Sequence, residues 1–248
     1  MCRIAILWGN FEDEFRSIFQ SLSDVASEDP LRLDKDGRKL SHKDGWGFLN
    51  INKERIVFNR YSTPLRRDTE VPEISNGIIM MHARAAAPGE GMGVLNNHPF
   101  HATDQRYEVY MVHNGWFDKN KINETLGYEH PEFINDTEVF LNFVMTIDGD
   151  MKTRLAKAME ISKRKEYIKG GANILVVAVD RRPPNVLSIF YHADNAPGKE
   201  FKEYNKLYAV KNEKFKGVFS SSIIRSSYFP KDLRTSEIER GKLYSEEL

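Results

Sequence analysis

Short turns between strand-like segments constrain the fold of this chain more than any other feature. The stretch "WGFLNI" (46–51) reaches "RIVFNRY" (55–61) through a turn that contains Asn52 and Lys53. Likewise, "NILVVAVD" (173–180) reaches "VLSIFYH" (186–192) through "RRPPN". Parallel neighbouring strands need a crossover of a dozen or more residues, so connections this short predict antiparallel hairpins.

Helical periodicity appears in an early segment and in a central block. The segments are "EDEFRSIFQSLSDVA", "KNKINETL", "DTEVFLNFVMTI" and "MKTRLAKAMEISKRK". Hairpins interrupted by a block of helices predict an α+β fold in which helices stack outside antiparallel sheets. Because there is no internal repeat, low-complexity stretch or Gly/Ser linker, we expect a single domain over 1–248.

The charge balance argues against several partner classes. Lys+Arg and Asp+Glu number 36 each, so no overall field recruits nucleic acid or an anionic membrane. The basic run Ser162–Lys169 is interpreted as a solvated helix face. The longest apolar runs, such as Ile174–Val179, are far shorter than the ~20 residues that span a bilayer.

Cys2 is the only cysteine, which excludes an internal disulfide and a Cys-rich metal site. This composition fits a reducing compartment, and the N-terminus lacks the pattern of a secretory signal, so we expect a cytoplasmic protein. A lone cysteine is most often a small buried hydrophobe. Removal of Met1 would instead give Cys2 a free thiol and a free α-amino group, and the amine could accept the thiol proton near neutral pH.

Three further positions each allow a structural and a functional interpretation. Arg84 follows an apolar strand and is either a surface ion-pair residue or a planar fork for a substrate carboxylate. Asn114-Gly115 is either a turn or an oxyanion hole made of the Asn side-chain amide and the Gly backbone N–H. Asp136 is either the N-cap of a helix or the receiver of a substrate ammonium group.

The order of these positions along the chain resembles that of the class II glutamine amidotransferases, a branch of the N-terminal-nucleophile hydrolases. The motifs that carry the resemblance are Cys2, "HAR" (82–84), "NNHPF" (96–100), "HNG" (113–115) and "NDTE" (135–138). "HKDGWG" (42–47), together with "NNHPF", is most similar to the stand-alone, single-domain members. The resemblance covers residues 2 to about 140.

This resemblance implies a four-layer αββα sandwich and hydrolysis of the glutamine side-chain amide through a thioester, with release of ammonia. Cys2 would be the nucleophile and its α-amino group the base. Asn114 and Gly115 would form the oxyanion hole, while Arg84 and Asp136 would bind the substrate α-carboxylate and α-ammonium groups. We therefore expect an enzyme that needs no metal or organic cofactor.

The chain departs from the members fused to synthases, which have Trp, Thr and His where this sequence has Ala85, Ala87 and Pro88. We therefore expect the substrate to be glutamine or another γ-glutamyl small molecule. Because no synthase or phosphate-binding motif is recognised, we expect the ammonia acceptor to be absent or to be a separate synthase subunit acting in trans.

Two alternatives come from other functional classes. His82, His98, His101 and His113 could form a metal site, although no carboxylate lies near them at a recognisable ligand spacing. The fold could also serve a regulatory protein that binds glutamine without hydrolysing it, because a fold does not establish a function.

Overall fold

The computed structural model describes residues 2–87, 89–127 and 133–248. The chain divides into two compact units, and each unit draws on segments far apart in the sequence. Unit 1 contains Met1–Pro88, Met92–Pro99 and Lys202–Ile238, and unit 2 contains Gly89–Gly91, Phe100–Phe201 and Glu239–Leu248. No sequence linker marks this division, and the single domain expected over 1–248 stays a prediction.

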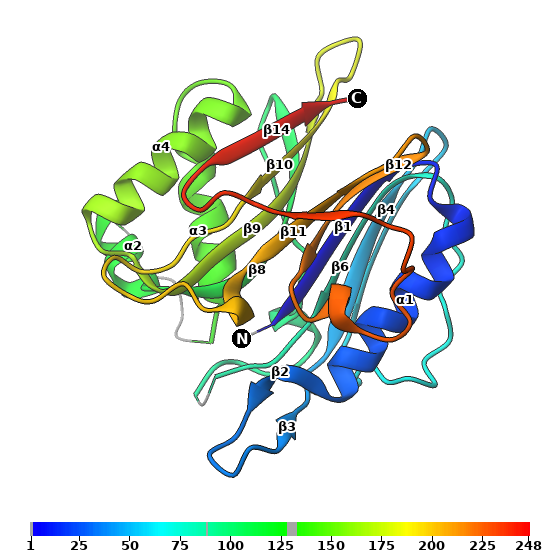
Figure 1. Cartoon of the computed structure of the whole chain (residues 1–248). Coiled ribbons are helices and arrows are strands. Elements are labelled where there is room, and N and C mark those ends of the chain that lie inside the picture. The colour runs from blue at the N-terminus through cyan, green and yellow to red at the C-terminus, as the bar shows by residue number, and fades with distance from the viewer. Residues whose placement is uncertain (1, 88, 128–132) are drawn as a thin grey trace. The chain divides into compact units, whose positions relative to one another are not determined.

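Unit 1 is built on a seven-stranded sheet in which every neighbouring pair of strands is antiparallel (Figure 1). In order across the sheet, its strands are β13 (Thr235–Glu237), β11 (Leu207–Lys211), β12 (Phe215–Ser220), β1 (Arg3–Gly9), β6 (Gly77–Ala83), β4 (Trp46–Ile51) and β5 (Ile56–Tyr61). The strand that follows Cys2 therefore lies in the middle of the sheet.

Helix α1 (Glu12–Ser27) covers one face of this sheet (Figure 1). Its buried apolar side chains recur at helical spacing and join the core of unit 1 together with Ala5 and Leu7 of β1. Acidic residues fill its first turn, where negative charge is favourable, and the side chain of Asn76 accepts hydrogen bonds from the N–H groups of Phe11 and Glu12.

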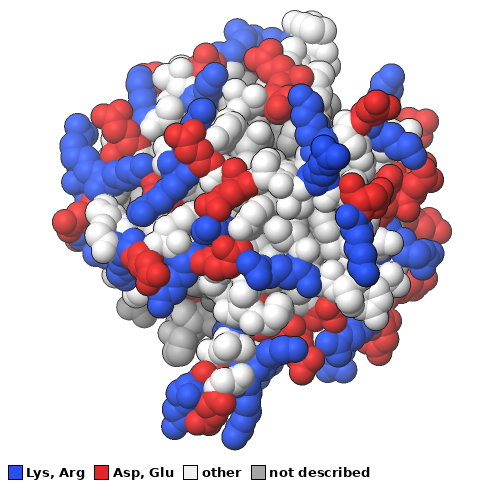
Figure 2. All heavy atoms as spheres, viewed as in Figure 1, with Lys and Arg blue, Asp and Glu red and all other residues white. Residues whose placement is uncertain are grey.

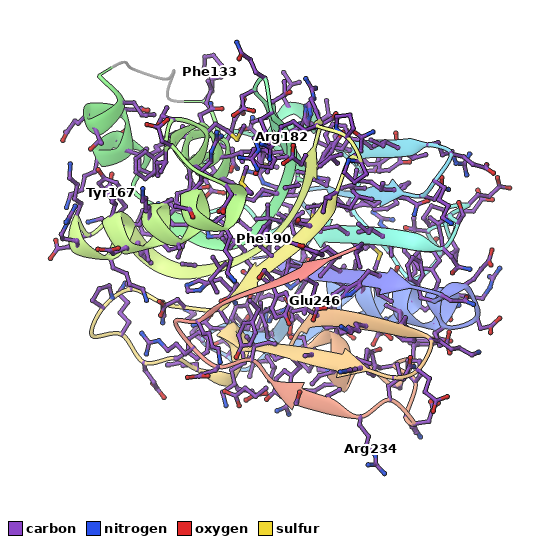
Figure 3. All side chains as sticks on the ribbon, turned by 90° about the horizontal axis from the view of Figure 1, so that it is seen from above. Phe133, Tyr167, Arg182, Phe190, Arg234 and Glu246 are labelled. Carbon is purple, nitrogen blue, oxygen red and sulfur yellow. The ribbon has the colours of Figure 1, made fainter. Side chains whose placement is uncertain are left out.

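Unit 2 is built on a five-stranded antiparallel sheet and three helices. The strands, in order, are β14 (Leu243–Glu247), β10 (Leu187–His192), β9 (Ile168–Asp180), β8 (Tyr107–Phe117) and β7 (Phe100–Thr103). The helices are α2 (Lys119–Leu126), α3 (Asp136–Met145) and α4 (Met151–Arg164). Their apolar faces pack on the sheet in a second core, which includes Tyr167 and Phe190 (Figure 3).

The predicted helices and strands are confirmed, and both predicted hairpins form, as β4–β5 and β9–β10. The strand-like segments of the sequence also include "CRIAILW", "GIIMMHAR", "YEVYMVHN", "LYAVKN" and "VFSSS", which correspond to β1, β6, β8, β11 and β12. The sequence analysis missed the hairpin of β2 (Asp29–Leu33) and β3 (Lys39–Leu40), as well as β7, β13 and β14. Three short 3-10 helices, at Val94–Asn96, Glu203–Asn205 and Ile223–Arg225, were also missed. The missed elements are short or rich in polar residues, so period-two alternation is weak in them.

The interpretation of Ser162–Lys169 as one solvated helix face is wrong. Helix α4 ends at Arg164, and β9 begins at Ile168. Ser162 and Tyr167 are buried, and Lys163 forms an ion pair with Asp194 at 2.6 Å. Elsewhere, positive and negative side chains alternate over the face drawn in Figure 2. No helix in the described part of the chain is long and apolar enough to cross a membrane.

Candidate active site

Cys2 lies directly before β1 and is half-buried, with its Sγ 3.9 Å from the carbonyl oxygen of Ala85. Arg3 pairs with Ala83 in the β1–β6 ladder, so the end of β6 lies beside the start of β1. The thiol therefore sits next to the "HAR" motif rather than inside the apolar core. Met1, whose removal the sequence analysis considers, lies outside the described residues.

Arg84 follows β6 and is only 1% exposed, so the interpretation of this residue as a surface ion-pair residue is wrong. Its backbone N–H donates to Gly45 O at 2.8 Å, and its carbonyl accepts from Asp44 N at 3.1 Å. The Asp44 carboxylate also accepts from Ala86 N at 2.9 Å. The "HKDGWG" loop thus fixes the backbone on both sides of Arg84. Pro88, one of the departures noted above, lies outside the described residues.

The glycines of "HKDGWG" allow this segment to pack against "NNHPF". A Cβ on Gly47 would overlap with the carbonyl oxygen of His98. A Cβ on Gly45, which has φ +116°, would overlap with the Asn97 side chain. The Asn97 amide donates to Tyr61 O at 2.7 Å. The two motifs that the sequence analysis treated together are therefore in contact within unit 1.

Asn114 and Gly115 lie inside strand β8, so the prediction that they form a turn is wrong. They pair with Asn173 and Ala172 of β9. A Cβ on Gly115 would overlap with the carbonyl oxygen of Gly171, which shows that this glycine permits close approach of the two strands. Asn114 is 1% exposed.

Asp136 is the first residue of α3, whereas the N-cap is Asn135, whose side chain accepts from Thr137 N at 2.9 Å. The N-cap interpretation of Asp136 is therefore displaced by one residue. The Asp136 carboxylate accepts from Phe117 N at 2.7 Å, which ties it to the end of β8. In unit 2, this contact brings together Asp136 and the strand that carries Asn114 and Gly115.

Burial raises the pKa of Asp136 to about 6, even though hydrogen bonds from Phe117 and Thr137 favour the ionised form. The neighbouring His113 is buried and stays neutral, because desolvation lowers its pKa to about 4. Its Nδ1 is 3.0 Å from Thr137 Oγ1, and its Nε2 is 3.3 Å from Gly171 O. His113 thus links α3 and β9 at the position of Gly115.

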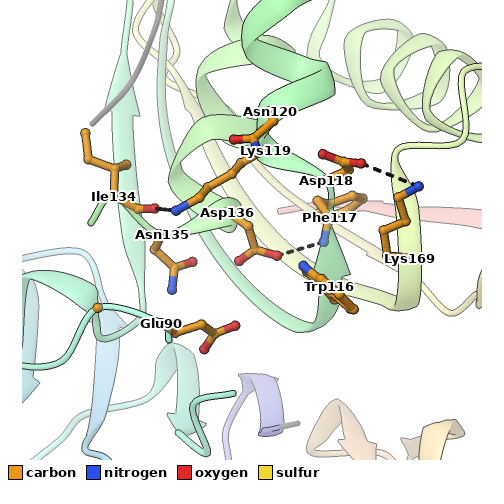
Figure 4. A pocket seen from close by; sticks show the side chains of 11 residues that line it. Glu90, Trp116, Phe117, Asp118, Lys119, Asn120, Ile134, Asn135, Asp136 and Lys169 are labelled. Carbon is orange, nitrogen blue, oxygen red and sulfur yellow. Dashed lines mark hydrogen bonds and ion pairs between the residues drawn. The ribbon is translucent and has the colours of Figure 1, made fainter. Parts of the chain in front are cut away.

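Asp136 lines a pocket of about 440 Å³ within unit 2 (Figure 4). This volume falls in the range of ~300–1,000 Å³ that is typical of small-molecule sites. Trp116, which is 57% exposed, and the Lys169–Asp118 ion pair, at 3.4 Å, form other parts of its wall. The pocket therefore combines an aromatic surface, an ion pair and a carboxyl group whose pKa is raised.

The four histidines considered as metal ligands have other contacts. His82 and His98 stack in unit 1 with ring centroids 3.9 Å apart, and His101 lies 3.3 Å from Glu108 and stacks on Tyr110 in unit 2. Within residues 2–87, 89–127 and 133–248, no group of three or more His, Cys, Asp or Glu residues is arranged to hold a metal ion.

Sequence analysis missed a buried polar network that includes Arg3, the residue directly after Cys2. Asp29 Oδ2 accepts from Arg3 Nε at 2.5 Å and from His42 Nε2 at 2.7 Å, while Oδ1 accepts from Ser222 Oγ at 2.6 Å. All four residues are fully buried. The one sequence signal that could have revealed the network is an arginine directly before the apolar run of β1, a position where an unpaired charge would be costly.

The electrostatics of the network favour an ionised Asp29 and a neutral His42. Burial alone would raise the pKa of Asp29, but the hydrogen bond from His42 and the charge of Arg3 hold it well below its usual range. Desolvation lowers the pKa of His42 to about 4. Neutral His42 therefore donates its Nε2–H to the Asp29 carboxylate.

The described structure thus places the predicted residues in two groups. Cys2 and Arg84 belong to unit 1, at the neighbouring ends of β1 and β6. Asn114, Gly115 and Asp136 belong to unit 2, at the end of β8 and the start of α3.

No protein-family model matches the chain, and no curated protein sequence does. Among the solved structures that are similar to the chain, two match 98% of it. The first, described as the allosteric regulatory enzyme of purine biosynthesis, has a TM-score of 0.68 and 16% sequence identity. The second is the glutamine phosphoribosylpyrophosphate amidotransferase of B. subtilis in complex with ADP and GMP, with a TM-score of 0.65 and 13% identity.

The chain spans about half the length of these neighbours, because the matches cover 46% and 47% of their chains. At this level of identity the likeness shows the fold alone. The α+β fold class is confirmed, and the chain has the fold of these two neighbours, the second of which is a glutamine amidotransferase. The resemblance to class II glutamine amidotransferases that the sequence suggested is thus confirmed at the level of the fold.

Proposed function

We propose that this protein is an enzyme that hydrolyses the side-chain amide of glutamine, with Cys2 as the nucleophile after removal of Met1. The observation that carries the proposal is the position of the only cysteine: half-buried at the start of β1, beside the backbone of the "HAR" motif. The amidotransferase fold of the chain supports the same class of reaction.

In the proposed mechanism the α-amino group of Cys2 takes the proton from the thiol, and the thiolate attacks the amide carbon. The Asn114 side-chain amide and the Gly115 N–H stabilise the negative charge that develops on the oxygen. Ammonia leaves with a proton returned by the amine, and water then hydrolyses the thioester to give glutamate. The pKa of His113, which desolvation lowers to about 4, makes this imidazole a poor proton acceptor near neutral pH, and this fits a site whose base is an amine.

We assign Arg84 to the substrate α-carboxylate and Asp136 to its α-ammonium group. The burial of Arg84 supports this role, because a guanidinium kept from water forms strong bidentate contacts with a carboxylate. The raised pKa of Asp136 supports it as well, because a cation brought into its pocket would stabilise the ionised carboxyl group.

The test uses protein whose Cys2 N-terminus has been verified by intact mass. We expect glutamate and ammonia to form in equal amounts from glutamine, and Cys2→Ala to reduce the rate by more than about 1,000-fold. Protein that retains Met1 is the matched control, since its amine is not the α-amino group of Cys2. Wild-type rates in the Cys2→Ala variant would refute the proposal.

A γ-glutamyl amide with a larger leaving group is a second candidate substrate, because it has the same α-carboxylate and α-ammonium groups as glutamine and because Ala85 and Ala87, two departures from the synthase-fused members, lie just after Arg84. Comparing kcat/KM for glutamine with that for γ-glutamyl anilide and γ-glutamyl methylamide would decide between them. Binding without turnover would point instead to a regulatory protein. Trp116 can report this binding by fluorescence, because Trp8 and Trp46 are both buried at 4% exposure.

We also propose that the ammonia is used by a separate synthase protein, in the cytoplasm, and that hydrolysis needs no metal or organic cofactor. Residues 141–248 contribute helices and strands to the same two units, and no phosphate-binding fingerprint occurs in them. Amination of an acceptor by the purified chain alone would contradict the first part. Activity that is lost on chelation and restored by one metal would contradict the second.

A further inference from the structure

The buried network behind the nucleophile consists of Arg3, Asp29, His42 and Ser222. Its contacts form a connected series that ends on the main chain of residue 2. Arg3 Nη1 lies 3.4 Å from the carbonyl oxygen of Cys2, and Arg3 Nε donates to Asp29. His42 and Ser222 each donate to the same Asp29 carboxylate.

The network is stiff, because each member is held from more than one side. Arg3 Nη1 also donates to Tyr204 O at 3.1 Å, and its guanidinium lies 3.7 Å over the Tyr204 ring. The backbone N–H of Leu31 donates to Asp29 Oδ1 at 2.9 Å. The backbone N–H of His42 donates to Ala26 O at 2.7 Å, which ties the main chain of His42 to the last turn of α1. A buried arginine with this many partners has little freedom to move.

The same loop connects the network to the backbone around Arg84. Two residues after His42, Asp44 bonds to the backbone of Arg84 and Ala86. Cys2 Sγ lies beside the carbonyl of Ala85, between those two attachment points. Residues 42–44 therefore hold the strand end next to the thiol, while Arg3 holds the main chain of Cys2 itself.

A fully buried ion pair is an expensive way to gain stability, since desolvation of the charges offsets much of their attraction. Its value here lies in geometry, because a nucleophile at a chain terminus has one covalent neighbour fewer to hold it. A misplacement of about 1 Å at a reacting atom can lower a rate by about 100-fold.

We infer that Arg3, Asp29, His42 and Ser222 are positioning residues that hold the main chain of Cys2 in its reactive geometry. The inference rests on the proposed function for its kinetic part, and on contacts within unit 1 for its structural part. None of the four residues is assigned contact with the substrate.

The test compares Asp29→Asn with Asp24→Asn in Met1-free protein. Asp24 is the matched control, because it lies in the same unit and also accepts from an arginine, Arg67, and from a serine, Ser226. We expect Asp29→Asn to lower kcat for glutamine at least about tenfold with KM within about twofold, and Asp24→Asn to leave both nearly unchanged.

Two substitutions at His42 separate positioning from general destabilisation. His42→Gln keeps an N–H donor near the place of Nε2, whereas His42→Met removes it. We expect the kcat of His42→Gln to stay within about threefold of the wild-type value, and that of His42→Met to fall by about tenfold. Equal losses in the two variants, or a kcat for Asp29→Asn equal to that of Asp24→Asn, would overturn the inference.

Hydrogen exchange of the peptide covering residues 2–8 provides a readout that needs no activity. Deuterium uptake there should rise in Asp29→Asn and His42→Met, and not in Asp24→Asn. If wild-type protein releases no ammonia, the proposed function fails, while this exchange pattern still decides whether the network positions the N-terminus; unchanged uptake would refute it. Should Asp29→Asn fail to fold, Ser222→Ala removes a single donor and is judged by the same two readouts.

Discussion

Unit 1 and unit 2 each contain an aspartate with a role in the proposed reaction, Asp29 as a positioning residue and Asp136 as a binding residue, and the two carboxyl groups differ in their surroundings. Asp29 accepts hydrogen bonds from Arg3, His42, Ser222 and Leu31, so its charge is fully compensated and its pKa is lowered. Asp136 has fewer donors, lines an open pocket, and has its pKa raised to about 6.

The difference separates two uses of a carboxylate. A carboxylate whose partners are all supplied by the protein is a structural anchor, and removing it leaves those partners unsatisfied. A carboxylate kept in a pocket with too few partners is costly to the folded protein but ready for a cationic ligand. The following predictions test this contrast, beginning with the largest expected effect.

Replacing aspartate by asparagine should lower the free energy of unfolding at position 29 and should not lower it at position 136. Asp29→Asn is expected to lower the free energy of unfolding by about 3–5 kcal/mol at pH 7, because Arg3 would remain buried without its counter-charge. Asp136→Asn should leave it unchanged or raise it by about 1 kcal/mol, because a carboxyl group with a raised pKa opposes folding when ionised. Urea denaturation measures both, and equal losses would contradict the contrast.

The oxyanion role predicted for unit 2 should affect turnover. Asn114→Ala is expected to lower kcat by about 100–1,000-fold with little change in KM, the usual effect of losing one oxyanion donor. Asn173→Ala is the matched control, because Asn173 is equally buried and pairs with Asn114 across the β8–β9 ladder. An Asn114→Ala variant that changes KM alone would remove the oxyanion assignment.

Asp136→Asn should act on binding instead, raising KM for glutamine by about 10–100-fold through loss of a charged partner. Arg84→Ala is expected to act in the same direction. Asp118→Asn is the control within the same pocket, because Asp118 already has Lys169 as its partner. If Asp118→Asn raised KM as much as Asp136→Asn does, the pocket would lack the proposed specificity.

The smallest effect concerns the pH dependence of KM. Because Asp136 must be ionised to bind an ammonium group and its pKa is about 6, KM should rise by up to about tenfold for each pH unit below 6. At pH 7 and slightly above, where Asp136 is already ionised, KM should not change with pH. Steady-state kinetics at constant ionic strength measure this dependence, and it should vanish in Asp136→Asn.

The sequence predicts the elements of the fold well, because long apolar strands such as β9 and amphipathic helices such as α1 show their periodicity directly. It also suggests candidate site residues, whose order along the chain is more specific than any single motif, and their roles stay predictions. It fails where long-range contacts decide the outcome. The Asn114-Gly115 pair resembles a turn locally, yet Gly171, more than fifty residues later, requires glycine at 115 inside a strand.

The network around Asp29 shows the same limit more strongly. Its members come from β1, β2, the loop before β4 and the segment after β12, and no spacing connects them. Asp29 and His42 lie in a stretch whose sequence is typical of a long loop, and only the fold brings Asp29 into contact with Arg3 and with His42. The burial of Arg84 could not be inferred either, because a strand-end arginine is usually solvated.

The central place of β1 in its sheet also has a consequence for biosynthesis. Residues 3–9 pair with β12, whose residues 215–220 are translated more than 200 residues later. At the usual ~5–20 residues per second, the N-terminal strand waits roughly 10–40 s for this partner. Its other neighbour, β6, becomes available earlier, so β1 can be paired on one side in the meantime. The sheet around the strand that follows Cys2 is therefore completed only after β12 has been translated, which would delay a competent nucleophile at Cys2 until then.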